Sequence, residues 1–216
     1  MELINTIEIL PSEYSNNDYK SPDSSFLESK IEWYNYWKKC ISDSNLEKLE
    51  PIEKGSFFVD LNTLNDNELK IILLKTLTEI DLENIDDEIS HLFGGIVLKF
   101  NDQILIQPNC CCDIGNLSEW LKILISKENE WHQLWIGHPW VFFKTVDDLI
   151  YFSDYTEKNE AQNLDEKFSI SKVLFEKNLK KIKQEQEEFK IRIERNLIEL
   201  NIQQPKEIAD LLASLR

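Results

Sequence analysis

The stretch GGIVLKFNDQILIQP, residues 94–108, holds the clearest β pattern of the chain and decides the expected fold. Two runs of branched apolar residues flank Asn101 and Asp102, and both residue types tolerate the left-handed backbone that a tight hairpin turn requires. The pattern therefore predicts an antiparallel hairpin. No Lys-Ser or Lys-Thr follows the glycine pair at its entry, so a phosphate-binding loop is not expected there.

A second β pattern lies downstream, where LWIGHPWVFFK (134–144) and LIYFSDY (149–155) flank a Val-Asp-Asp turn. We expect these two runs to pair, and the two hairpins to join in one antiparallel sheet. Apolar helical segments before and between the hairpins would cover that sheet. The predicted fold class is α+β: an antiparallel sheet built from hairpins with helices on one face, plus a long C-terminal helix.

Helical periodicity appears in several segments around the hairpins. Residues 26–41 carry an aromatic stripe at three- and four-residue steps, which we expect to face the core. Asn65 or Asp66 is expected to cap the apolar helix in ELKIILLKTLTEI. Asn116, followed three residues later by Glu119, matches a reciprocal capping box at the start of a further helix.

The tail of the chain has a different composition. From about residue 165 it is rich in Lys, Glu and Gln, and apolar residues recur every seven positions, as in a coiled coil: Phe168, Phe175, Ile182 and Phe189. We expect an exposed lead-in over residues 1–25, an α+β domain over 26–160 and a helical extension over 161–216. That extension either packs on the domain or forms a dimer, so the expected state is monomer or homodimer.

The charge of the chain restricts its partners. Asp and Glu number 40 and Lys and Arg 24, which gives a formal net charge of −16. Nucleic acid is not an expected ligand, because phosphate backbones are bound mainly through Lys and Arg. The same charge would speed encounter with a basic protein. No run approaches the roughly 18 apolar residues of a membrane span, and no secretory leader is recognised, so a cytoplasmic location is expected.

Three consecutive cysteines at 110–112 admit three interpretations. They pack as small apolar groups in a tight turn, they contribute to a metal site, or one of them acts as a thiol nucleophile. A metal site usually needs spaced ligand pairs, which are missing, so neither a metal nor another cofactor is expected. A hydrolase-like constellation would use these residues: Cys111, Cys112, Asp113, His132 and His138.

The segment GGIVLKFNDQILIQPNCCCDIGNLSEW, followed by WIGHPWVFF and LIYFSDYTE, carries a family resemblance. It resembles a group of uncharacterised bacterial proteins that share a P-x-C-C-x-D-x-G turn after a hairpin and a W-I-G-H-P-W block downstream. More loosely it is similar to the SUKH superfamily of bacterial toxin-immunity proteins. That second resemblance implies an α+β fold, no catalysis, and function by binding and blocking a cognate toxin. The cysteine triplet departs from the general SUKH pattern.

The expected function is a non-catalytic protein-binding module, specifically an immunity protein that neutralises a toxin through an acidic surface. The expected partner is a protein, a basic toxin in this interpretation. The alternative is a cysteine-dependent hydrolase that uses the 110–113 turn and a nearby histidine. The residues expected to face the partner are acidic or aromatic, with one histidine: Asp86, Asp87, Glu88, Asp113, Trp135, His138, Trp140, Asp147, Asp148 and Asp154.

Overall fold

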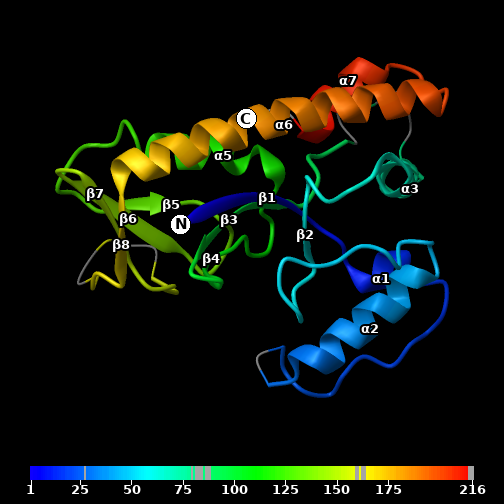
Figure 1. The fold of residues 1–216 in the computed structure, drawn as a ribbon, viewed down its shortest axis with the longest axis horizontal. Helices are drawn as coiled ribbons and strands as arrows, with labels where there is room; N and C mark the ends of the chain where they lie inside the picture. Colours follow the sequence, from blue (N-terminus) through cyan, green and yellow to red (C-terminus); the bar gives the residue numbers. More distant parts are fainter. Residues whose placement is uncertain are drawn as a thin grey trace. The chain divides into compact units, whose positions relative to one another are not determined.

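The computed structural model describes residues 1–26, 28–78, 80, 85, 89–158, 161 and 164–213. Its strands form two antiparallel four-stranded sheets, in the orders β2-β1-β3-β4 and β5-β6-β7-β8 (Figure 1). The predicted α+β class is confirmed, including the long helix near the C-terminus. Two compact units divide the chain: the first spans 1–5, 93–188 and the last residues from 213, and the second spans 6–92 and 189–212.

The first unit contains most of the strands. In chain order its elements are β3 (Gly94–Phe100), β4 (Gln103–Ile106), a short 3-10 helix (Ile114–Asn116), α5 (Leu117–Lys122), β5 (His132–Leu134), β6 (Val141–Val146), β7 (Leu149–Phe152) and β8 (Phe168–Ser171). It also includes the start of β1 (Glu2–Glu8) and the first part of α6 (Lys172–Glu199).

The first predicted hairpin is confirmed. Strands β3 and β4 pair with Phe100 opposite Gln103, so Asn101 and Asp102 form the two-residue turn. Both turn residues have positive φ, 47° and 62°, as a type I′ turn requires. The register shifts between Leu98 and Lys99, as at a β-bulge.

The second hairpin is confirmed in part. Strands β6 and β7 pair across a turn at residues 147–148, as predicted. The run 134–144 is not one strand, however, because β5 ends at Leu134 and β6 begins at Val141. Gly137 has φ +89° and Pro139 has no N–H to donate, so the segment between the two strands forms a loop. The expectation of one common sheet is wrong, since the two hairpins belong to different sheets.

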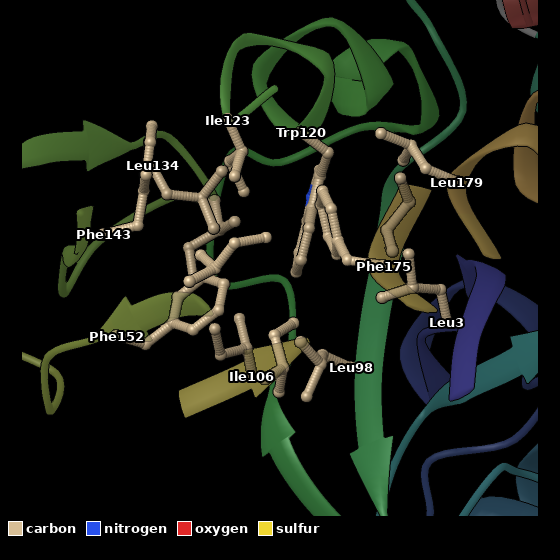
Figure 2. Close-up of a cluster of buried hydrophobic side chains, with 14 of the residues drawn as sticks. Leu3, Leu98, Ile106, Trp120, Ile123, Leu134, Phe143, Phe152, Phe175 and Leu179 are labelled. Atoms are coloured by element: carbon tan, nitrogen blue, oxygen red, sulfur yellow. The ribbon is translucent and has the colours of Figure 1, made fainter. Parts of the chain in front are cut away.

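The core of the first unit lies between its strands and its helices. Figure 2 shows Trp120 of α5 beside Phe175 of α6, whose ring centroids lie 6.2 Å apart with a 28° angle between the planes. Both side chains are fully buried, together with Leu98, Ile106 and Phe152 from the strands. An aromatic pair in this geometry adds about 0.5–1.5 kcal/mol to the burial of its area.

Apolar side chains of the heptad pattern in the tail are buried within the chain. In the first unit Phe175, Leu179 and Ile182 of α6 are at most 1% exposed, which leaves this part of the stripe no exposed seam for a coiled coil. Phe168, by contrast, belongs to strand β8. The division expected at residues 160 and 161 does not match the two units, because α6 contributes residues to both.

The second unit contains α1 (Pro11–Tyr14), α2 (Lys30–Ser42), β2 (Phe58–Asp60), α3 (Asp66–Leu77) and α7 (Pro205–Ala213), with the later residues of β1 and α6. Residues 6–8 of β1 pair with β2. The prediction of an exposed lead-in over 1–25 is therefore wrong for residues 2–8. These residues form β1, and most of its side chains are buried.

Two helix predictions in the second unit have different outcomes. The Asn65 cap of α3 is confirmed, with a complete reciprocal capping box between Asn65 and Glu68. The aromatic stripe of α2 is only partly inward: Trp37 is fully buried and donates to the Ile9 carbonyl at 2.7 Å. Phe26 is 42% exposed and stacks on Trp33 at 4.0 Å.

Within the described residues, no helix is long and apolar enough to cross a membrane.

Candidate binding pocket at the cysteine turn

The cysteine turn, residues 109–116, connects β4 to α5 in the first unit. Cys110 and Cys111 are exposed, whereas Cys112 is buried, and all are free thiols. Cys111 has φ +66°, a left-handed conformation, and lies in a turn within the triplet. Consecutive cysteines therefore have different environments, and the packing interpretation applies to Cys112.

The start of α5 differs from the predicted capping box. Asn116 has helical φ and ψ and its side chain makes no cap. Its amide nitrogen instead donates to Cys112 Sγ at 3.0 Å, inside the protein. The capping residue is Asp113, whose Oδ1 accepts from the Gly115 N–H at 2.9 Å. The prediction placed the cap three residues late, because an Asp-x-Gly turn forms a short 3-10 helix ahead of α5.

The tryptophan loop, residues 135–140, lies directly against the cysteine turn. The Asn109 N–H donates to the Ile136 carbonyl at 2.7 Å, and the Asn109 amide nitrogen to the Pro139 carbonyl at 3.2 Å. A Cβ at Gly137 would lie 2.7 Å from the carbonyl carbon of Asn109, and closer still to the Cys110 oxygen. A glycine is needed at 137 because both its φ and this backbone approach exclude a side chain.

An open pocket of about 190 Å³ lies at this junction. The indole of Trp135, 44% exposed, contributes part of its wall. Two carboxylates, Asp113 and Glu119, line it as well, and Glu119 also pairs with Lys122 one turn along α5. The complete lining consists of Cys111, Asp113, Gly115, Asn116, Ser118, Glu119 and Trp135.

A second group of residues involves the tryptophan loop and the segment around Glu157. The backbones of Cys110 and His138 pair in an isolated antiparallel β-bridge. His138 Nε2 lies 2.7 Å from a carboxylate oxygen of Glu157, and its ring meets Trp140 edge-on at 4.6 Å. Trp140 and Thr156 exchange two backbone hydrogen bonds, which hold the Glu157 segment next to the loop.

The structure does not assemble the catalytic set predicted from the sequence. The pKa of the Cys111 thiol is raised, chiefly by its hydrogen bond with Cys110, which disfavours a reactive thiolate. Cys112 is buried. His132 lies on β5, where one ring nitrogen is 2.9 Å from the Lys127 carbonyl and the ring packs beside Phe143. Only His138 among the predicted bases lies opposite a cysteine, and that cysteine is Cys110.

The acidic residues predicted to face a partner are dispersed. Asp113 lines the pocket, while Asp147 and Asp148 are exposed at the β6–β7 turn. Asp154 forms an ion pair with Lys167 at 2.8 Å, which holds the pKa of the Asp154 carboxyl below its usual range. The remaining three predicted acidic residues lie outside the described residues: Asp86, Asp87 and Glu88.

The sequence interpretation missed Ser118, Glu119 and Glu157 as members of these sites. Glu119 matches the capping-box pattern in the sequence, which gives no sign that it shares a surface with Asp113 six positions earlier. Glu157 had no local signal, because only the pairing of Trp140 with Thr156 brings it to His138. Among the residues that the structure describes, no group of three or more His, Cys, Asp or Glu side chains is arranged to hold a metal ion.

Searches against protein families, curated proteins and solved structures give no match for this chain.

Proposed function

We propose that this protein is a non-catalytic protein-binding module, specifically a bacterial immunity protein that neutralises a cognate toxin, with the cysteine turn and tryptophan loop as its binding face. The observation that carries the proposal is the half-exposed Trp135 on a loop whose backbone is fixed by the Asn109 hydrogen bonds. Exposed aromatic side chains on rigid supports are the usual anchors of protein interfaces, and tryptophan is the residue most enriched there.

Charge supports a basic protein as the partner. The chain has a net charge of −16, and carboxylates of Asp113 and Glu119 lie beside Trp135 in the pocket. A complementary positive partner would be steered toward this face, so the association rate should fall steeply as the ionic strength rises. The location of the interaction in the cytoplasm belongs to the same proposal.

Native mass spectrometry of the protein purified from its own cells at low salt tests this function. We expect a complex with one basic polypeptide, which dissociates when Trp135 is replaced by Ala. The matched control is Phe100→Ala in the β3–β4 hairpin, because Phe100 is exposed to the same extent, 45% against 44%. A bare chain, or a complex that tolerates Trp135→Ala and Phe100→Ala equally, would refute the proposed binding face.

A cysteine-dependent hydrolase is the second candidate, for one specific observation. Cys110 pairs with His138 in an isolated backbone bridge, and His138 Nε2 lies 2.7 Å from a Glu157 carboxylate oxygen, so a thiol, an imidazole and a carboxylate belong to adjacent segments. If His138 serves as the base, iodoacetamide should alkylate Cys110 faster near neutral pH than it does in the His138→Gln variant.

The pH profile of Cys110 alkylation, read by peptide mass, decides this candidate. Activation by His138 predicts a reactive thiolate near neutral pH that His138→Gln removes, without a change in melting temperature. Cys110→Ser should then abolish hydrolysis of a p-nitrophenyl ester. The same pH dependence and rate of Cys110 alkylation in both proteins would exclude Cys110 as the nucleophile.

A further inference from the structure

We propose that the pocket beside Trp135 receives a single cationic side chain of the protein partner, and that this side chain is arginine. This inference rests on the proposed protein-binding function and names the chemical group that the binding face recognises. It is carried by the size of the pocket, the groups that line it and the fixed backbone beneath them.

The size of the pocket favours a single side chain over a larger ligand as its occupant. Pockets for cofactors and drug-sized molecules measure about 300–1,000 Å³ and bury most of the ligand. At about 190 Å³, and open to solvent, this pocket is too small for such a molecule. It suits one long side chain that enters from a partner surface, as an interface anchor does.

The groups in the lining select a planar cation. Trp135 is exposed and lines the pocket, and a guanidinium stacks favourably on an indole ring. The carboxylates of Asp113 and Glu119 and the hydroxyl of Ser118 can accept the five N–H donors of that guanidinium. A lysine ammonium is a compact point charge, so it stacks less well on an indole ring and donates fewer hydrogen bonds to the acceptors.

Lys122 is the local cation that an incoming arginine must replace. It pairs with Glu119 at the i, i+3 position of α5, and its own side chain is 57% exposed. The Glu119 side chain is only 20% exposed, whereas the Lys122 side of the pair faces solvent, so Lys122 can turn outward when a better cation arrives. Asp113 is held differently, because its Oδ1 also accepts from the Gly115 N–H and so keeps the carboxylate in place.

The backbone beneath the pocket is arranged in advance. Asn109 bonds to both Ile136 and Pro139, and Gly137 lies in close contact with the cysteine turn, so Trp135 and Asp113 are held by connected segments. A binding group that is already ordered loses little conformational entropy when the ligand arrives.

Titration of the full chain with N-acetyl-arginine amide, followed by the NMR signal of the Trp135 indole N–H, tests the inference. The signal is assigned from its loss in Trp135→Phe. We expect a saturable shift with the arginine compound, and about tenfold weaker binding of the neutral, nearly isosteric N-acetyl-citrulline amide, because a hydrogen bond to a charged group is stronger than its neutral counterpart.

Three charge variants locate the binding. Asp113→Asn retains a capping side chain and Glu119→Gln retains its shape, yet each should weaken arginine binding about threefold or more by removing one negative charge. Asp147→Asn removes the same charge at the exposed β6–β7 turn and should leave the affinity unchanged. Equal binding of citrulline and arginine, or an equal effect of all three variants, would overturn the inference.

The two proposals fail separately. If native mass spectrometry shows a partner complex that needs Trp135, but the arginine compound does not shift the indole signal, the arginine inference is wrong and the binding function stands. If the arginine compound binds with the expected charge dependence while no partner complex depends on Trp135, the pocket is a guanidinium site and the proposed function is wrong.

Discussion

Gly137→Ala should destabilise the first unit strongly, because the tryptophan loop would have to leave the cysteine turn. A non-glycine residue in a left-handed conformation costs about 1–2 kcal/mol. The new Cβ would also collide with the backbone of Asn109 and Cys110, which cannot move as a flexible side chain does. The two hydrogen bonds from Asn109 to the loop, at 2.7 Å and 3.2 Å, contribute about 0.5–1.5 kcal/mol each and would be lost or weakened.

Together these effects predict a loss of about 2–5 kcal/mol in the free energy of unfolding. Urea titration followed by tryptophan fluorescence and circular dichroism measures it, and an unchanged m-value would show that the native state remains compact. Gly55→Ala is the matched control, since Gly55 also has positive φ, +87°, but the Cβ would meet Lys30 atoms at 3.1–3.2 Å, beyond the distance of outright collision.

The control variant should therefore lose less stability than Gly137→Ala by about 1 kcal/mol or more. Equal losses would refute the close backbone approach of the two segments. A small loss in Gly137→Ala together with an intact Trp135 environment would show that the loop does not need its glycine, and the idea of a fixed support for the pocket would fall with it.

Iodoacetamide should modify exposed Cys111 in the native protein, whereas buried Cys112 should react only after unfolding, as peptide mass mapping would show; equal protection would contradict the turn geometry. Trp120→Ala should lower the free energy of unfolding by about 3–5 kcal/mol, because it empties a fully buried site, and a urea titration would measure this. Lys167 depresses the pKa of the Asp154 carboxyl, so their pair stabilises the fold above the unfolded aspartate pKa of about 3.9 and this contribution is lost as the pH falls through the lower folded pKa. Asp154→Asn should therefore lower the melting temperature slightly at neutral pH and leave it unchanged in strong acid.

Local patterns in the sequence predicted the elements whose cause is local. Asn101 and Asp102 accept positive φ without a tertiary partner, so the β3–β4 hairpin could be placed from its turn. Asn65 caps α3 through atoms within three residues, which made that helix start readable as well. The same reasoning misplaced the cap of α5, because the Asn116 side chain donates to Cys112 Sγ and does not cap the helix.

The two segments of the candidate site could be predicted from the sequence, but the contact between them could not. The cysteine triplet and the W-I-G-H-P-W block stood out in the sequence, and Asp113 and Trp135 were both named as binding residues. Nothing in either segment indicated that Asn109 would bond to Ile136 and bring the two together across 27 positions. The pairing of His138 with Cys110, rather than with Cys111 or Cys112, is a consequence of that same contact.

The sequence by itself determined the fold class, the β3–β4 and β6–β7 turns, the apolar stripe of the long helix and the strong negative charge, because each depends on neighbouring residues or on composition. Only the tertiary structure decided that β1 is an internal strand and that the hairpins belong to two sheets. It also decided which cysteine pairs with a histidine in a backbone bridge, and which carboxylates line the same pocket as Trp135. Those outcomes depend on contacts between distant segments, whose free energy is set by packing and backbone pairing over the whole unit and leaves no periodic trace in the sequence.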